Sequence, residues 1–183
     1  MKKAVMLFAN GFEEVEALMT ADILMRGGVE VTLASITEEM EVTGSHGIRV
    51  GMDAVMEQVD FAGQDAVLIP GGMPGTLNLG DSKKVTGVLT EMHEAGKIVG
   101  AICAAPSVLG QCGMLKGKRA TCYPGFEEKL TGAEFVDEKA VVDGNVVTSR
   151  GLGTSMEFGF ALLEVLVSKE KAEEIRKQIV FMY

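Results

Sequence analysis

Short apolar runs recur along the chain, and longer segments with helical spacing separate them. The runs typical of buried strands are Lys3–Phe8, Glu30–Ser35, Ala66–Ile69 and Ile98–Ile102. Parallel strands need crossover connections, so strands that alternate with helices predict a mostly parallel sheet with helices on both faces. The chain has no internal repeat and no linker, so residues 1–183 are expected to form a single α/β domain.

The segments between these runs show the spacing of helices and turns. We expect helices over 12–26, 83–95, 104–111, 154–167 and 169–180. One hairpin is expected over 42–50, and another around Asp143-Gly144-Asn145, which joins Ala140–Asp143 to Val146–Ser149. A short strand over 119–121 and a short helix that begins near Pro124 complete the predicted elements.

The first helix carries one acidic side chain in an otherwise apolar stripe. With the helical repeat, one face contains Phe12, Glu16, Met19 and Ile23. Glu16 is either a buried carboxyl group with a specific task or an edge position that pairs with a nearby arginine. Glu13 and Glu14 face elsewhere and are expected to form a solvated first turn, which the helix dipole favours.

A second apolar patch lies on the opposite side of this helix. It consists of Leu18, Ala21, Leu24 and Met25. A helix that is apolar on two sides must be covered on both sides, so we expect a second subunit to cover one of them.

Composition narrows the class of protein and its partners. The chain has 183 residues, a hydrophobic fraction of 47% and a net charge of −9, so nucleic acid is not expected as a partner. No apolar run approaches the roughly twenty residues of a membrane span, and the strand at Lys3 leaves no room for a signal peptide. Three cysteines without paired or zinc-like spacing predict neither disulfides nor a metal site. We therefore expect a cytoplasmic protein with no membrane partner.

Cys103 stands at the join between the strand Ile98–Ile102 and the small-residue helix after it. A side chain at such a turn faces unpaired N–H groups and the positive end of a helix dipole, and both lower the pKa of a thiol. This is the arrangement of a nucleophile elbow. The turn alone is equally compatible with an inert cysteine that packs as a small hydrophobic residue.

A second loop favours the reactive interpretation of Cys103. The strand Ala66–Ile69 runs into a Pro-Gly-Gly turn at 70–72, and paired glycines let backbone N–H groups approach a bound group. The carboxyl ends of parallel strands meet at one edge of a sheet, so both loops should border one crevice. We expect Cys103 to adopt a strained, positive φ there, unlike the other two cysteines.

Four motifs make the chain resemble the ThiJ/PfpI superfamily, and within it the parkinsonism-associated protein deglycase branch. They are Gly11-Phe-Glu-Glu-Val-Glu16, Leu68-Ile-Pro-Gly-Gly-Met73, Ala101-Ile-Cys-Ala-Ala-Pro106 and Thr148-Ser-Arg-Gly-Leu-Gly-Thr-Ser-Met-Glu-Phe158. The resemblance covers essentially the whole chain. It implies a flavodoxin-like three-layer sandwich that forms a homodimer.

The resemblance also implies roles for single residues. Cys103 would be the nucleophile and would be hydrogen-bonded to a protonated Glu16. The N–H groups of Gly72 and Ala104 would form a pocket for an anion, with Gly71 beside them.

Three further positions lie near this site by the same resemblance. Arg26 and His46 would lie near the dimer interface, where human-type members carry arginine at both, so His46 is a substitution. Tyr123 stands where many members carry a histidine twenty residues after the cysteine. Tyr123 can donate a hydrogen bond to a substrate, but a phenol is a poor base near neutral pH. Without that histidine a Cys–His pair cannot form here, which argues against a peptidase.

Two functions remain. In the first, Cys103 adds to a small dicarbonyl such as methylglyoxal, Glu16 transfers a proton, and lactate is released without a metal or organic cofactor. Glycated protein or nucleotide adducts are further substrates that the resemblance implies. In the second, the protein is a redox sensor or chaperone whose Cys103 is oxidised to a sulfinate without turnover.

Overall fold

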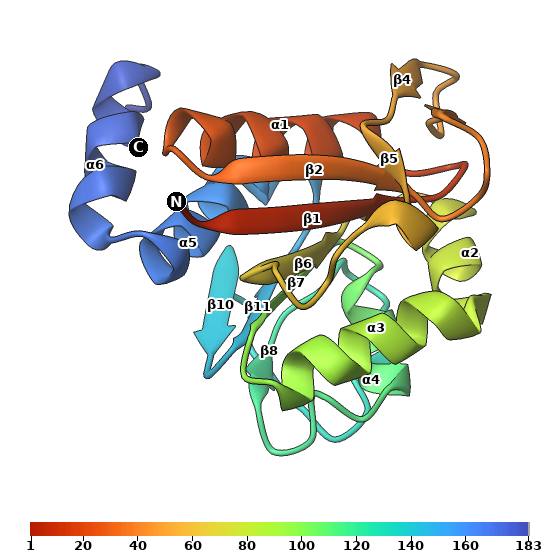
Figure 1. Cartoon of the computed structure of the whole chain (residues 1–183). Helices are drawn as coiled ribbons and strands as arrows, with labels where there is room; N and C mark the ends of the chain where they lie inside the picture. Colours follow the sequence, from red (N-terminus) through yellow and green to blue (C-terminus); the bar gives the residue numbers. More distant parts are fainter. Residues whose placement is uncertain (183) are drawn as a thin grey trace.

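The computed structural model describes residues 1–182, which form a central sheet between two layers of helices (Figure 1). The strand order is β10-β11-β7-β6-β1-β2-β5, and only the pair β10 and β11 is antiparallel. These strands are β1 (Lys3–Phe8), β2 (Glu30–Ser35), β5 (Ala54–Val55), β6 (Ala66–Ile69), β7 (Ile98–Ile102), β10 (Ala140–Asp143) and β11 (Val146–Ser149). The predicted flavodoxin-like sandwich with a mostly parallel sheet is confirmed.

Helices pack on both faces of the sheet. One layer contains α1 (Glu14–Arg26), α5 (Ser155–Leu166) and α6 (Lys169–Gln178), and the other contains α2 (Gly75–Asp81), α3 (Lys83–Glu94) and α4 (Pro106–Gln111). Successive side chains of a strand point to opposite faces. Met6 of β1 therefore packs in the first half of the core and Leu7 in the second.

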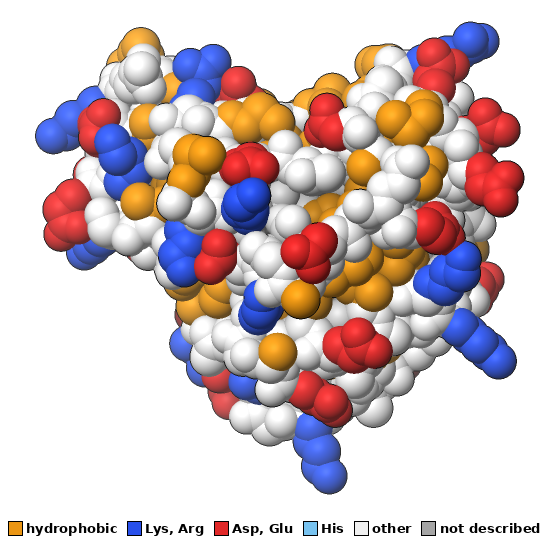
Figure 2. All heavy atoms as spheres, viewed as in Figure 1, with side chains coloured by type: hydrophobic (Ala, Val, Ile, Leu, Met, Phe, Trp, Pro, Cys, Tyr) orange, Lys and Arg blue, Asp and Glu red, His pale blue; other side chains and the backbone are white. Residues whose placement is uncertain are grey.

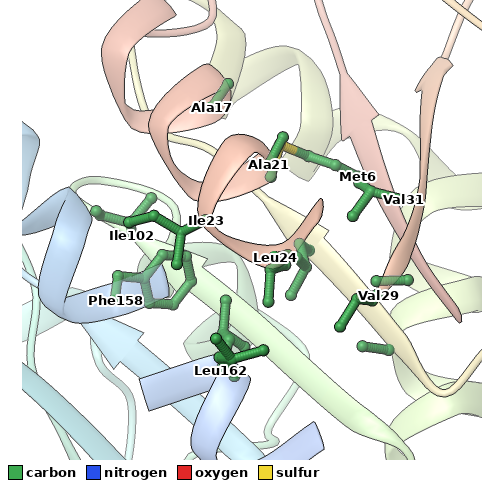
Figure 3. Packing of buried hydrophobic residues seen from close by; sticks show 14 of the residues in the cluster. Met6, Ala17, Ala21, Ile23, Leu24, Val29, Val31, Ile102, Phe158 and Leu162 are labelled. Carbon is green, nitrogen blue, oxygen red and sulfur yellow. The ribbon is translucent and has the colours of Figure 1, made fainter. Parts of the chain in front are cut away.

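The core beneath α1 is shown in Figure 3, where Ile23 and Leu24 of α1 face Phe158 and Leu162 of α5. Three residues of the predicted stripe, Phe12, Glu16 and Ile23, are at most 1% exposed, and the fourth, Met19, is partly buried against the same core. The predicted second patch is only half correct. Its members Ala21 and Leu24 belong to the core, whereas Leu18 is 37% exposed and Met25 is 47% exposed.

Two helices begin later than the spacing predicts. α1 begins at Glu14 rather than at residue 12, because the Glu13 side chain caps its first turn by accepting a hydrogen bond from the Glu16 N–H (2.7 Å). α4 begins at Pro106 rather than at residue 104, because Cys103 and the two alanines after it form the turn that leaves β7.

The spacing of apolar residues does not predict several short elements. These are β5, α2 and β9 (Glu134–Phe135), which pairs with β8 (Arg119–Ala120), and the 3-10 turn Met56–Gln58. The expected helix near Pro124 is only a 3-10 turn, Glu127–Lys129. The hairpin expected over 42–50 is present as β3 (Glu41–Thr43) and β4 (Arg49–Gly51).

The surface in the same view mixes charged and hydrophobic side chains, and its outline dips along the side where α1 lies (Figure 2). Among the described residues, no helix combines the length and the apolar character that crossing a bilayer requires.

Candidate active site

Cys103 follows the last residue of β7 and adopts the predicted strained backbone, with φ 66°. It is the only cysteine of residues 1–182 with a positive φ, which costs a non-glycine residue about 1–3 kcal/mol. Two backbone hydrogen bonds hold the turn. The Cys103 N–H donates to the Ser149 carbonyl (3.0 Å), and the Cys103 carbonyl accepts from the Tyr123 N–H (2.8 Å). The side chain of Cys103 is half-buried.

The Pro-Gly-Gly turn after β6 packs directly against this elbow. A Cβ on Gly71 would lie 2.6 Å from the Cys103 Cβ and 2.6 Å from Glu16 Oε2, so only glycine fits. The Gly71 N–H donates to Glu16 Oε2 (3.0 Å). The resemblance places this glycine beside the anion pocket, but its N–H is already hydrogen-bonded to the carboxyl group of Glu16. The N–H groups of Gly72 and Ala104 are the backbone groups that lower the pKa of the Cys103 thiol.

Close backbone contact also joins this turn to the loop before α1. Gly11, Gly72 and Gly75 touch the opposite loop so closely that a Cβ on any of them would overlap its atoms. The Gly75 N–H donates to the Gly11 carbonyl (3.1 Å), and the Glu13 N–H donates to the Gly71 carbonyl (2.8 Å). The start of α1, and with it Glu16, is thus fixed against the cysteine loop.

Glu16 lies beneath Cys103 and is 1% exposed. Burial raises the pKa of its carboxyl group to about 7, while the hydrogen bond with Cys103 opposes that increase and the charge of Glu13 adds to it. No ion pair of the described residues includes Glu16, so the alternative of an arginine partner is not what the structure shows.

The thiol of Cys103 is coupled to this carboxyl group. Burial first, and then the negative charge of Glu16, raise the pKa of the thiol, whereas the N–H groups of Ala104 and Gly72 lower it. The net effect is a raised pKa, so the lowered thiol pKa expected from the turn is wrong: a second negative charge beside the first is strongly disfavoured. Near neutral pH the thiol therefore keeps its proton, while the carboxyl group of Glu16 is close to its pKa.

Tyr123 borders the opening of this site. Its side chain is 50% exposed, and its Cδ2 faces Gly151 and Cys103 across a small space. Neither histidine of the described residues makes a hydrogen bond with Cys103: His46 bonds Glu14, and His93 contributes its carbonyl to Asn145. The structure thus contains no Cys–His pair at the elbow.

The prediction of a solvated Glu14 is wrong. Glu14 is 3% exposed. Its carboxylate accepts hydrogen bonds from the His46 N–H (2.7 Å) and from the Ser45 hydroxyl (3.2 Å), and its Oε2 lies 2.8 Å from His46 Nδ1. Burial alone would raise the pKa of Glu14, but the hydrogen bonds from His46 and Ser45 outweigh it and lower the pKa to about 2. The spacing of α1 could not reveal this contact, because the hairpin β3–β4 supplies it.

Arg26 and His46 lie at opposite ends of α1 within one subunit. Arg26 forms an ion pair with Asp22 (2.6 Å) near the helix C-terminus, and His46 binds Glu14 in its first turn. The ligand atoms of Glu13, Glu14 and His46 lie within 4.8 Å of one another. Since the carboxylate of Glu14 and the ring of His46 already satisfy each other, this geometry does not require a metal ion.

The other two cysteines belong to the half of the core on the opposite face of the sheet from Cys103. Burial raises the pKa of both thiols, that of Cys122 to about 11. Cys103 differs from them by its positive φ and by its contact with Glu16, and not by a lower thiol pKa.

Comparisons with known proteins give matches over nearly the whole chain. The family model for the DJ-1/PfpI family matches residues 2–165. The chain is 40% identical to Protein DJ-1 homolog B of Arabidopsis thaliana over 181 residues, which are 98% of this chain and 41% of that longer protein. It is 33% identical to the Glutathione-independent glyoxalase DJR-1.2 of Caenorhabditis elegans, over 96% of this chain and 94% of that protein. The crystal structure of Drosophila melanogaster DJ-1beta superposes with a TM-score of 0.95 at 37% identity, over 100% and 99% of the two chains.

Proposed function

The chain belongs to the DJ-1/PfpI family, and on that basis we propose that it is a cysteine enzyme for small reactive dicarbonyls or their adducts. The relative from Caenorhabditis elegans is named a glyoxalase. The single observation that carries the proposal is the pair of Cys103 and the buried Glu16, whose carboxyl group has a pKa raised to about 7. The pair combines a nucleophile with an acid/base group, and the proposed reaction needs no metal or organic cofactor.

The first step is addition of Cys103 to the aldehyde carbon. The Cys103 sulfur forms the new bond, the carbonyl oxygen takes up the thiol proton, and the product is a hemithioacetal. The N–H groups of Gly72 and Ala104, which favour a negative charge on the sulfur in the free protein, would stabilise the developing negative charge on that oxygen.

The second step moves hydrogen between neighbouring carbons. Glu16 removes the proton from the sulfur-bound carbon, and the electron pair forms an enediolate with its charge on the second oxygen. Glu16 then returns a proton to the second carbon while the hydroxyl proton of the first carbon passes to the second oxygen, so that a thioester forms. A pKa of about 7 suits both halves of this transfer. The resulting thioester is then hydrolysed by water, which releases lactate from methylglyoxal and restores the thiol.

A lactate assay tests this function. We expect Cys103→Ser and Glu16→Gln each to lower methylglyoxal turnover by at least about a hundredfold, because each removes one of the two groups that react. Cys112→Ser is the matched control and should keep wild-type turnover, since Cys112 is a half-buried thiol that packs against the other half of the core from Cys103. Equal lactate formation by the wild type and Cys103→Ser would reject the enzyme.

The redox sensor remains the second candidate because the N–H groups of Gly72 and Ala104 favour a negative charge on the sulfur. The same groups would hold the anion of a sulfinate. Mass spectrometry after mild peroxide treatment, read beside the lactate assay, separates the two functions. Sulfinate on Cys103 in a protein that forms no lactate would favour the sensor.

A homodimer is part of the proposal. The face of α1 that points away from the core exposes Val15, Leu18 and Met25, and a second copy of the chain would cover them. Because Arg26 and His46 lie at opposite ends of α1, an antiparallel pair of α1 helices would bring Arg26 of one subunit towards His46 of the other.

A further inference from the structure

Gly151 faces the reacting groups directly and leaves a space there. It follows β11, and its backbone is extended (φ 161°, ψ −166°), a conformation that any residue can adopt. A Cβ built on Gly151 would lie 3.3 Å from Tyr123 Cδ2, 3.8 Å from Cys103 Sγ and 3.8 Å from Glu16 Oε1, and these are its nearest neighbours. A volume of one methyl group is thus open between the thiol, the carboxyl group and the phenol ring.

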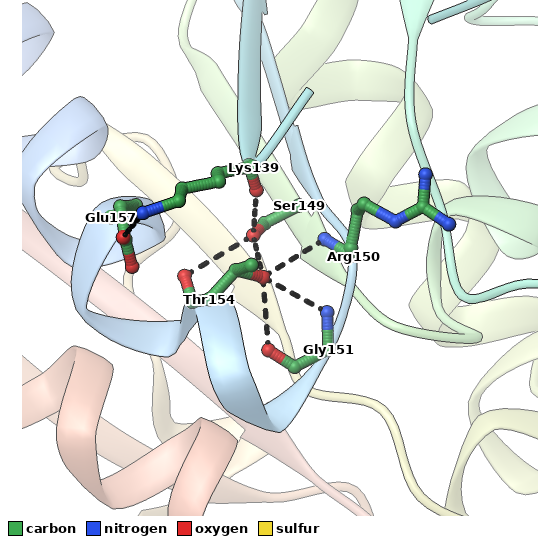
Figure 4. Close-up of polar contacts among 6 residues, drawn as sticks. All are labelled: Lys139, Ser149, Arg150, Gly151, Thr154 and Glu157. Atoms are coloured by element: carbon green, nitrogen blue, oxygen red, sulfur yellow. Dashed lines mark hydrogen bonds and ion pairs between the residues drawn. The ribbon is translucent and has the colours of Figure 1, made fainter. Parts of the chain in front are cut away.

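The backbone around this space is held in place by Thr154 (Figure 4). Thr154 Oγ1 accepts hydrogen bonds from the N–H groups of Arg150 (3.2 Å) and Gly151 (3.1 Å). The Gly151 carbonyl in turn accepts from the Thr154 N–H (2.8 Å). Since both ends of the Gly151 peptide are fixed, the space beside it has a defined size.

We propose that Gly151 determines which dicarbonyls the site accepts, by reserving room for the substituent on the second carbonyl carbon of the substrate. This inference rests on the proposed function. When the first carbon is bound to Cys103 Sγ, the second carbon must lie within reach of Glu16 for proton transfer. A group attached to the second carbon then falls between Sγ and Oε1, which is where the open space lies.

The two simplest dicarbonyl substrates should differ in how they fill this space. Methylglyoxal carries a methyl group on its second carbon and fills the space, whereas glyoxal carries only a hydrogen atom there. A methyl group added to the protein at residue 151 would occupy the same volume and exclude the larger substrate only.

The substitution Gly151→Ala is compatible with the fold. The backbone conformation suits alanine, and the tightest new contact, 3.3 Å, is with the ring edge of the half-exposed Tyr123, which can shift slightly. Gly153→Ala is the matched control, because it lies two residues further on in the turn Leu152–Thr154 and its Cβ would meet nothing within 4 Å.

The test compares kcat/KM for methylglyoxal and glyoxal in the wild type and both variants. We expect Gly151→Ala to lower the ratio of methylglyoxal to glyoxal activity by at least about tenfold, as the loss of room for one carbon predicts. Gly153→Ala should keep the wild-type ratio. An unchanged ratio in Gly151→Ala, or an equal change in both variants, would overturn the inference.

A second measurement separates this inference from the proposed function. Each aldehyde is tested for its ability to protect Cys103 from alkylation, which requires the hemithioacetal but no turnover. We expect methylglyoxal to lose its protection in Gly151→Ala while glyoxal keeps it. If the wild type turns over neither aldehyde, the proposed function fails, and equal protection of all three proteins by both aldehydes would then refute the role of Gly151 as well.

Discussion

At the scale of single residues, Glu16 and Cys103 must be treated as one titrating unit. The carboxyl group is held beneath the sulfur by the Gly71 N–H and by its own helix, so neither group can move away when the other gains a charge. Protonation of the pair therefore decides whether sulfur can act as a nucleophile.

The pH dependence of catalysis should follow this unit. Below pH 7 the carboxyl group of Glu16 is protonated and cannot accept a proton, so kcat/KM for methylglyoxal should decline as the pH falls through about 7, the pKa of Glu16. The carboxyl carbon of Glu16 should titrate at the same pH in NMR spectra. Glu14 is an internal control, because its pKa is lowered to about 2. A flat activity profile across neutral pH would contradict the role of Glu16.

The same residue should lower stability at alkaline pH. Because burial raises the pKa of Glu16 from 4.5 to about 7, the folded protein holds this proton more tightly than the unfolded chain does. Its stabilising contribution is complete below pH 4.5 and decreases by about 3 kcal/mol as the pH rises through 7. Glu16→Gln removes the titration, so its free energy of unfolding in urea should exceed that of the wild type at pH 8 but not at pH 4. Parallel pH dependences in both proteins would contradict this prediction.

At the scale of elements, the hairpin β3–β4 is attached to α1 through one buried carboxylate. Gly44 lies so close to Glu14 that a Cβ there would overlap its side chain, and Ser45 and His46 both bond the carboxylate. The hairpin tip is therefore anchored to the first turn of the helix that carries Glu16.

Glu14→Gln should loosen this attachment. A buried charged acceptor is replaced by a neutral amide, and hydrogen bonds to charged groups contribute about 1.5–3 kcal/mol. We expect faster amide hydrogen exchange at 44–48 and a loss of stability of that order. Glu41→Gln, in the same hairpin, removes only the exposed ion pair of Glu41 with Arg49 and should change neither quantity measurably. Equal exchange at the tip in both variants would refute the anchor.

The central strands were predictable from the sequence, because both of their faces are buried and their residues are therefore continuously apolar. Ala66–Ile69 and Ile98–Ile102 agree with the structure to the residue. α2 was missed because Gly75–Asp81 contains two glycines and no helical periodicity, and its start is set by contacts with Gly11. The motifs and the apolar stripe of the first helix were enough to predict that Cys103 and Glu16 form a pair. The contacts of Gly151 and Glu14 could not be predicted, because they join segments that only the fold brings together.

At the scale of the whole molecule, α1 presents an exposed apolar strip to the outside, beside the dip in the surface in Figure 2. Its residues Val15, Leu18 and Met25 are 39%, 37% and 47% exposed, although the opposite side of the helix is fully packed. Contacts of modest area are doubled by a two-fold axis, so this strip suffices for a dimer if neighbouring loops contribute.

Sedimentation velocity at micromolar concentration tests the assembly. We expect a species of twice the 19.4 kDa chain mass for the wild type and a monomer for Leu18→Glu, because the new charge cannot be desolvated in an apolar interface. Val142→Glu, at a comparably exposed apolar position on β10, should remain dimeric. A wild type that sediments as a monomer would exclude the dimer.

The three glycines that join the loop before α1 to the turn after β6 have a consequence for inactivation by heat. Through Gly11, Gly72 and Gly75 the two loops touch main chain to main chain, so no flexible side chain lies between the sheet and the start of α1. The distance between the carboxyl group of Glu16 and the thiol of Cys103 should therefore stay the same until the strands themselves separate. The site should not unfold separately from the rest of the domain. The proposed activity should therefore be lost on heating at the same temperature at which the whole sheet unfolds cooperatively.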